Sequence, residues 1–456
     1  LRSTNDEYYN ISEISTDEMI VPTRGQDWYD NGKWLDIHRQ TFAPASPAGL
    51  DNINSAWTNL FIGVARANVV LSGIENVSFT SKATVTAELR TLRAFYYFLL
   101  MDLFGGVPIV TDPAIEARPQ NTRAEVFAFI ESELKAARPD LPAKWSQDMN
   151  GRVTQGAVDA MLASLYLNAQ VFTGTVSATG LQPGTQRWQD AYNAANAVIT
   201  SGNYSLATNW RQNFTADNNL TPEIIFAVKY LNVTDIGLNF LMRSLHYNQY
   251  SGAETPWNGF STLAETYAAF DPNDQRRLIF LAGPQVNLAT GQPAVDRQNN
   301  PLVFDPNIPD VTAAAEGAGV RIDKWPIDPN HVNRNNGNDY AWFRLGEMYL
   351  IRAEAANELG NLAQATADIN LLRARVFSPP KPIAPATQAA MRTAILNERL
   401  YEMTAEGKRR QDLIRMNKFT QGTWYAKTAF DPWKILFPIP QTQIETNPLL
   451  KQNPGY

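Results

Sequence analysis

The sequence predicts a mostly α-helical protein in which four TPR-like helix pairs form a right-handed helical scaffold, packed against an irregular, loop-rich lobe with a few short strands. Two observations predict this fold class. Apolar residues recur with a helical period in paired segments towards both ends of the chain. In the middle of the chain this period fades, and Asn, Gly, Pro and aromatic residues dominate. We therefore divide the 456 residues into the regions 1–202, 203–339 and 340–456.

The N-terminal region is expected to begin with an extended segment and to continue with helix pairs. In the first pair, a helix over 52–71 packs against a helix whose apolar face includes Leu92 and Leu99. The second of these helices ends at Gly105, with a proline shortly beyond, which is the usual signal of a helix C-terminus. The other helices predicted in this region span 122–138, 152–172 and 188–201.

The central region is expected to be the ligand-binding lobe. Its predicted regular elements are a short buried strand over 223–229 and a short helix over 261–270. A long irregular segment inside a helical protein usually carries function. The alternative is a set of capping loops that only complete the fold.

The C-terminal region opens with Trp342, Leu345, Gly346 and Tyr349, which reproduce the W-x₂-L-G-x₂-Y opening of a tetratricopeptide repeat. A partner helix is expected to follow this one. A last helix over 388–417 closes the set of helix pairs.

The final segment, residues 436–456, contains four prolines. Because proline fixes φ and removes a backbone donor, we expect neither a helix nor an interior strand here. The segment also carries too much apolar surface for a frayed tail. We therefore predict an extended strap that lies against the folded body. The apolar residues concerned are Leu436, Phe437, Ile439, Ile444, Leu449 and Leu450.

Charged residues recur inside the apolar helical stretches, where charges persist only when they are paired. Glu398, Glu402 and Glu406 would line one helix face and repel one another unless cations intervene. We predict a buried salt-bridge lattice between helices. The cations expected to neutralise these glutamates are Arg399, Arg409 and Arg410. The other charged residues in apolar helical stretches, which also need partners, are Arg93, Arg152, Arg344 and Glu347.

Composition excludes several classes of function. The net charge of −6 argues against a nucleic-acid-binding protein, which needs a basic face. No run of about 20 apolar residues suits a membrane-spanning helix. The chain has no cysteine and three scattered histidines, and it lacks the common nucleotide, hydrolase and zinc motifs. We assign no cofactor and no metal, and we favour a solvated loop over a Ca²⁺ site at 328–339 because the EF-hand spacing is missing.

Glycoside hydrolysis is the strongest enzymatic alternative, because it needs only two carboxylates about 5–10 Å apart. Glu398 and Glu402 have about that spacing on a helix, and Glu265 or Asp274 could contribute from the central region. Carboxylates on one helix face do not flank a substrate from opposite sides, and arginine neighbours would keep them ionised. A structural role is therefore favoured.

The segment 246–259 has the composition of a sugar-binding loop. Tyr247, Tyr250 and Trp257 offer rings for stacking against the C–H faces of a sugar, and Asn248 and Asn258 offer hydrogen bonds. The alternative is a loop whose aromatic side chains turn inward.

A second candidate lies near the N-terminus, where Trp28 and Trp34 stand close together with His38 beyond them. Aromatic residues at this density suit a binding platform. A purely structural role is the favoured alternative for this segment.

Several motifs in this order resemble the SusD/RagB family over nearly the whole chain. They are Trp57, Phe61, Gly63 and Arg66-Ala-Asn68; Leu89 to Phe98 with Leu103-Phe-Gly-Gly-Val-Pro108; Gly151-Arg152-Val-Thr154; Asp271-Pro-Asn-Asp274-Gln-Arg276; Glu398-Arg399 with Glu402, Glu406-Gly407, Arg409 and Asp412-Leu413; and the closing Phe437-Pro-Ile-Pro440 and Gln452-Asn-Pro-Gly-Tyr456.

The resemblance implies a non-catalytic, surface-exposed outer-membrane lipoprotein that binds oligosaccharide and delivers it to a SusC-like TonB-dependent transporter. It also implies attachment to the membrane through a lipidated N-terminal Cys, a residue absent from this sequence. The alternatives are a peptide-binding nutrient receptor of the RagB type and, less favoured, a glycoside-active enzyme. The family's ligand residues vary between members, so they cannot be carried over one by one.

Overall fold

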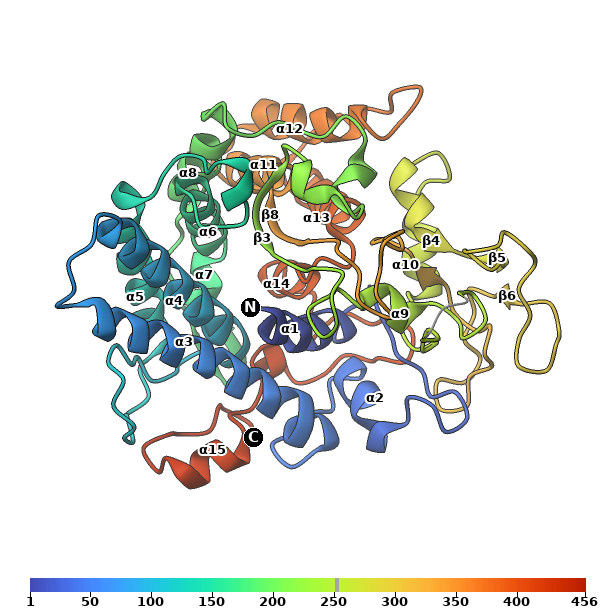
Figure 1. The fold of residues 1–456 in the computed structure, drawn as a ribbon, viewed down its shortest axis with the longest axis horizontal. Helices are drawn as coiled ribbons and strands as arrows, with labels where there is room; N and C mark the ends of the chain where they lie inside the picture. Colours follow the sequence, from blue (N-terminus) through green and yellow to red (C-terminus); the bar gives the residue numbers. More distant parts are fainter. Residues whose placement is uncertain (251–253) are drawn as a thin grey trace.

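The computed structural model describes residues 1–250 and 254–456 (Figure 1). Helices gather on one side of the molecule, and loops with short strands gather on the other. The mostly helical fold predicted from the sequence is confirmed. In the described part of the chain, no helix is both long and apolar enough to cross a membrane.

Eight helices form the array. In order along the array, α3 packs against α4, α4 against α5, α5 against α6, α6 against α8, α8 against α11, and α11 against both α12 and α13. Since α8 precedes the loop-rich lobe and α11 follows it, the array joins the two ends of the chain. The eight helices are α3 (Asn54–Ile74), α4 (Lys82–Phe104), α5 (Arg123–Ala137), α6 (Gln155–Leu167), α8 (Trp188–Thr200), α11 (Leu345–Glu358), α12 (Leu362–Ala374) and α13 (Gln388–Met403).

Local signals in the sequence set the ends of these helices. Thr122 and Glu125 form a capping box at the start of α5. The hydroxyl of Thr154 caps α6 by accepting from the backbone N–H of Ala157. Helix α4 ends at Gly105, whose φ of 76° lies in a region that glycine adopts without steric cost.

The strands form four separate antiparallel pairs: β1 with β2, β3 with β8, β4 with β7 and β5 with β6. The pair β3–β8 joins the lobe to the array and places Val228 opposite Tyr340. The predicted strand over 223–229 is thus confirmed. The strands are β1 (Thr175–Ser177), β2 (Gly180–Gln182), β3 (Ile224–Val228), β4 (Phe280–Leu281), β5 (Gly283–Pro284), β6 (Val303–Phe304), β7 (Arg321–Ile322) and β8 (Tyr340–Arg344). The remaining helices are α1 (Arg2–Ile14), α2 (Lys33–His38), α7 (Ala169–Phe172), α9 (Phe240–Ser244), α10 (Ala264–Ala269), α14 (Arg409–Arg415) and α15 (Gln441–Thr446).

Two predictions near the array were wrong. The expected extended start is helix α1, which lies at the centre of the molecule (Figure 1). Trp342 does not begin a helix, because it lies in β8, and helix α11 begins at Leu345. The ring of Trp342 packs between Tyr8 and Phe95, with centroid distances of 5.2 and 4.8 Å. Burial of both faces of β8 overrides the local TPR pattern.

The predicted helix over 388–417 is two helices, α13 and α14, separated by a buried turn. Ala405 and Gly407 in this turn have φ angles of 64° and 72°, which no helix continues through. The prediction of a single element was therefore wrong at residues 404–408.

The C-terminal segment packs on the array as the predicted strap. The backbone N–H of Phe437 donates to the carbonyl of Leu103 at 2.8 Å, and the Asn453 amide donates to the carbonyl of Phe104 at 3.0 Å. The expectation that no helix forms here was wrong, because the short helix α15 begins directly after Pro440. Proline is tolerated at that position because a helix's first N–H groups have no intrahelical partner.

The predicted salt-bridge lattice is present, but Arg344 and Arg276 pair with its three glutamates in place of Arg399, Arg409 and Arg410. Arg344 is fully buried and pairs with Glu402 at 2.6 Å and with Glu406 at 2.8 Å. Arg276 pairs with Glu398 at 2.7 Å. The cations predicted from sequence pair elsewhere: Arg399 with Asp412, Arg409 with Asp17 and Arg410 with Asp102.

Candidate functional site

The candidate site lies on the loop-rich lobe, where a strained N-terminal loop meets the segment after α9. Trp28, Asp30 and Asn31 have φ angles of 62°, 39° and 55°. Positive φ in a residue as bulky as Trp28 is rare and costs on the order of 1–3 kcal/mol. Such strain persists only where surrounding contacts impose it, and it concentrates at functional sites.

Those contacts come from the segment around Trp257. The indole Nε1–H of Trp28 donates to the carbonyl of Trp257 at 2.6 Å. The ring of Trp28 also lies against Gly259, where an added Cβ would come within 2.3 Å of it. Gly259 therefore permits the close approach that joins the two loops. Trp28 and Trp257 are both partly exposed.

Tyr247 is fixed beside them by charged groups. Its hydroxyl donates to the Asp27 carboxylate at 2.6 Å, and the guanidinium of Arg297 lies 4.5 Å from the centre of its ring. Arg297 is about half exposed and stands between β5 and β6. The Asn248 amide, also exposed, donates to the carbonyl of Val295 at 2.9 Å.

The segment between β7 and β8 supplies the far side of the site. His331 Nε2 is hydrogen-bonded to the hydroxyl of Tyr250, and their rings meet edge to face at 5.0 Å. The guanidinium of Arg334 lies 5.9 Å from the ring of Trp257. We call the surface formed by Trp28, Tyr247, Tyr250, Trp257, Arg297 and Arg334 the aromatic face.

The aromatic face combines partly exposed rings with guanidinium and amide groups. Rings can stack on the apolar C–H faces of a sugar, and the polar groups at their edges can bond to its hydroxyls. Each guanidinium is also held by a carboxylate: Arg297 by Glu316 and Arg334 by Glu254 at 3.3 Å. The site therefore carries fixed donors without a large excess of positive charge.

Two buried arginines support this surface from below. Within the described residues, Arg24 and Arg321 hydrogen-bond only neutral oxygens, and burial lowers the pKa of Arg24 to about 10. Both bind Asn258: Arg24 Nε donates to its carbonyl at 2.9 Å, and Arg321 Nη2 donates to its side-chain oxygen at 2.8 Å. These bonds hold the end of the Trp257 segment in place.

Three of the predicted site residues lie below the surface, so their assignment to ligand contact was wrong. Asn258 is fully buried on the two arginines. His38 is also fully buried, its Nε2 lies 2.8 Å from the carbonyl of Tyr425, and burial lowers its pKa. Trp34 is 6% exposed and donates to Asp30 at 2.6 Å, which shapes the strained loop.

The other predicted residues are partly or fully exposed: Trp28, Tyr247, Asn248, Tyr250 and Trp257. Trp28 contacts Trp257, Tyr247 contacts Asp27 beside Trp28, and Tyr250 contacts His331, which lies three residues before Arg334. Residues 251–253, within the predicted segment 246–259, lie outside the described residues. Sequence reasoning missed Arg297 and Arg334. Each comes from a loop distant in sequence, and an arginine in a polar loop gives no local signal of its partner.

Three of the four carboxylates considered for glycoside hydrolysis, Glu398, Glu402 and Asp274, are held in ion pairs, whereas Glu265 is exposed and accepts from the backbone N–H of Tyr425 at 2.7 Å. Glu398 and Glu402 are buried against Arg276, Arg344, Arg373 and Arg375. Three of these arginines lower the pKa of Glu402 despite its burial, which keeps it ionised and unsuited to act as a general acid. Asp274 pairs with Arg276 at 2.7 Å.

Among residues 1–250 and 254–456, no three histidine or acidic side chains gather as a metal site would require. In the 328–339 loop the Asp328 carboxylate accepts from the backbone N–H groups of Asn330 and Gly337, at 2.8 and 3.0 Å. Asp328 thus closes its own turn.

Comparison with known families and proteins gives matches along the whole chain. A family model described as "SusD family" matches residues 173–456, and one described as "Starch-binding associating with outer membrane" matches residues 6–167. The SusD-like protein P25 of Formosa agariphila is 23% identical over an alignment of 519 residues including gaps. The alignment covers 98% of this chain and 90% of that protein.

The starch-binding protein SusD of Bacteroides thetaiotaomicron is 26% identical over an alignment of 501 residues including gaps. The alignment covers 98% of this chain and 85% of that protein. Surface glycan-binding protein A of the same organism has been solved in complex with laminarihexaose. It matches with a TM-score of 0.76 and 20% identity, over 99% of this chain and 98% of that one. At this identity the structural match establishes a shared fold.

Proposed function

This chain belongs to the SusD/RagB family, and from that premise we propose that it binds oligosaccharide at the cell surface and delivers it to a SusC-like TonB-dependent transporter of the outer membrane. The aromatic face is the proposed binding site, with Trp28, Tyr247, Asn248, Tyr250 and Trp257 as the ligand-contacting residues.

The observation that carries this proposal is the assembly of partly exposed rings from separate loops. Trp28 and Tyr247 come from segments far apart in sequence, yet direct hydrogen bonds tie both to one surface. The hydrogen bond from Trp28 to Trp257 and the bonds from the buried Arg24 and Arg321 to Asn258 hold this surface in place. A preformed surface loses less conformational entropy when a flexible sugar chain binds.

Two kinds of relative support oligosaccharide as the ligand. The name of one curated relative states that it binds starch, and one structural neighbour was solved with laminarihexaose. Maltohexaose and laminarihexaose are therefore the first probes. Isothermal titration with these two sugars, with uronic-acid oligosaccharides and with short peptides tests the proposal. We expect binding of an oligosaccharide, whereas binding of peptides alone would overturn the sugar assignment.

We propose that the protein performs no covalent chemistry on the sugar. The buried and ion-paired state of Glu398, Glu402 and Asp274 supports this. Prolonged incubation of the protein with the bound oligosaccharide, followed by chromatography of the mixture, should return the sugar at its original length. Shorter products would contradict a binding-only role.

The proposal of an outer-membrane location rests on the family model described as associating with that membrane. The transporter partnership and a lipid anchor rest on family resemblance alone. Affinity purification of the tagged chain from detergent-solubilised outer membranes of a native host tests the partnership. We expect a TonB-dependent transporter to co-purify; recovery of the chain without such a partner would contradict the partnership.

A further inference from the structure

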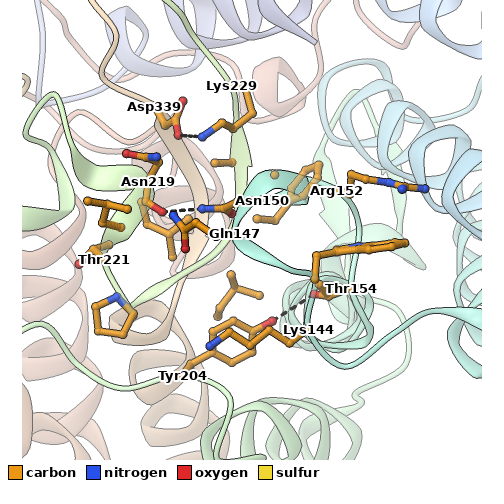
Figure 2. Close-up of a pocket in the computed structure, with 18 of the residues that line it drawn as sticks. Lys144, Gln147, Asn150, Arg152, Thr154, Tyr204, Asn219, Thr221, Lys229 and Asp339 are labelled. Carbon is orange, nitrogen blue, oxygen red and sulfur yellow. Dashed lines mark hydrogen bonds and ion pairs between the residues drawn. The ribbon is translucent and has the colours of Figure 1, made fainter.

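A cavity that shares no lining residue with the aromatic face lies between the start of α6 and strand β3 (Figure 2). Its volume is about 190 Å³. One wall is the loop before α6, including Trp145, Gln147 and Asn150, and the opposite wall is the segment that leads into β3. Drug-sized ligands usually occupy about 300–1,000 Å³, so this cavity suits a smaller group.

The loop before α6 is held in place by direct contacts across the cavity. The amide of Asn150 donates to the carbonyl of Asn219, and the hydroxyls of Thr154 and Tyr204 lie 3.1 Å apart (Figure 2). Gly151 has a φ of 97°, and a Cβ there would lie 2.6 Å from the side chain of Lys229. The loop can therefore lie directly on Lys229, and the cavity is preformed.

Several polar side chains that line the cavity are uncommitted. Within the described residues, the side chains of Gln147, Asn203 and Asn219 make no hydrogen bond to another residue. Together these three amides offer free donors and free acceptors around one small space. That combination suits a ligand that carries several hydroxyl groups.

The charges around the cavity are mostly neutralised in pairs. Lys229 pairs with Asp339 and Arg152 pairs with Glu88, so the ammonium of Lys144 is the one lining charge that lacks an ion pair in the described structure. A strongly anionic ligand would find little net attraction here. The ring of Trp145, which lines the cavity, is fixed by its Nε1–H donating to the carbonyl of Val153 at 2.8 Å and by the Arg152 guanidinium, which lies 3.9 Å from its centre.

We infer that this cavity is a second carbohydrate site, which takes a single neutral sugar residue, either free or at the end of a chain. The inference rests on the proposed function, since it assumes that the protein handles sugars. Uncommitted amides, paired charges and a fixed indole together match a neutral polyhydroxylated ring.

A neighbouring groove shares three lining residues with the cavity: Asn219, Lys229 and Asp339. This groove is also lined by Asn330, which directly precedes His331, the hydrogen-bond partner of Tyr250. The cavity therefore lies beside a groove whose lining reaches the loop that contacts Tyr250.

Titration of two variants against neutral oligosaccharides built from glucose, mannose, galactose or xylose tests this site. The first variant, Gln147→Ala with Asn219→Ala, removes two amides that make no side-chain hydrogen bond, so folding should be unchanged. The second, Tyr250→Ala with Trp257→Ala, removes the aromatic face. Asn76→Ala, an exposed amide at the end of the helix array, is the matched control.

We expect two equivalents of sugar per wild-type chain and one equivalent in each double variant, with at least a tenfold loss of affinity at the altered site and no change in the control. A crystal of the Tyr250→Ala, Trp257→Ala variant soaked in the bound sugar should show it between Gln147 and Asn219. One equivalent that is insensitive to the Gln147 and Asn219 changes would overturn this inference alone. Absence of sugar binding by the wild-type protein would instead contradict the proposed function as well.

Discussion

At the scale of single residues, the polar groups that matter most are buried, and their partners are set by the fold. Tyr247, Tyr250 and Trp257 were predicted as ligand contacts because their segment is too polar for a core strand, and they lie at the surface. His38 and Asn258 could not be assigned in this way. His38 is buried against the backbone carbonyl of Tyr425, and Asn258 against Arg24. These partners come from distant segments, so the local sequence does not predict the contacts.

Removal of Arg344 tests the buried lattice. The guanidinium has no exposed surface and joins Glu223, Glu402 and Glu406. Arg344→Ala removes one buried cation from three buried carboxylates, which keep only Arg375, Arg276 and Lys324 among them. We therefore expect a loss of about 3–5 kcal/mol of unfolding free energy. Chemical denaturation followed by circular dichroism measures this loss. Arg392→Ala, which breaks the exposed pair with Glu358, is the matched control and should cost at most about 1 kcal/mol.

Glu13 gives a pH-dependent prediction. Glu13 and Glu18 are buried side by side, and burial raises the pKa of Glu13 to about 7. The folded state thus holds a proton that the unfolded chain, with an ordinary pKa near 4.5, releases. Between about pH 4.5 and 7 the folded state binds more protons, so this group makes stability fall as the pH rises. Glu13→Gln removes that dependence.

We therefore expect the melting temperature of Glu13→Gln, relative to wild type, to increase from pH 5 to pH 8. Glu125→Gln is the control, because hydrogen bonds from Thr122 lower the pKa of Glu125 below its ordinary value of 4.5. That carboxylate contributes its stability above pH 4.5 and loses it only at lower pH, so the effect of Glu125→Gln should be nearly the same at about pH 5 and about pH 8. A Glu13→Gln difference that is constant with pH would contradict the raised pKa of Glu13.

At the scale of elements, helical periodicity predicted the array well because an amphipathic helix places its apolar residues at a regular spacing in the sequence. Helices α3, α5 and α8 lie close to their predicted ranges, and the predicted helix over 152–172 is divided into α6 and α7. The errors fall where tertiary contacts override local pattern. Trp342 has a helical motif around it, yet β8 pairs with β3 and buries it as a strand.

The C-terminal strap offers a prediction at this scale. Phe437 is fully buried, and its ring lies 4.6 Å from that of Phe42. Phe437→Ala should leave a cavity beneath the strap and lower the unfolding free energy by about 3–5 kcal/mol. Leu449→Ala is the matched control on the same strap. Leu449 is 48% exposed, so its removal should change stability by less than about 0.5 kcal/mol. Equal effects of both changes in denaturant melts would show that the strap does not pack as described.

At the scale of the whole molecule, the helix array acts as a frame and the loop-rich lobe presents the site (Figure 1). The lobe is tied to the frame by β3 and β8 and by the ion pairs around Arg344 and Arg276. The residues of the aromatic face come from loops of the lobe and the N-terminal loop, none of them from the array. A change of ligand within this architecture therefore needs changes only in loops.

Binding of oligosaccharide at the aromatic face distinguishes this protein's proposed role from a purely structural one. The most direct test compares the affinity of the wild-type protein and of Tyr250→Ala with Trp257→Ala for the tightest-binding oligosaccharide, by isothermal titration. Phe79→Ala, a partly exposed ring beyond the end of α3, is the matched control. Loss of two stacking rings should weaken the site at the aromatic face at least tenfold, with the melting temperature and the control unchanged. Wild-type affinity at every site of the double variant would contradict the claim.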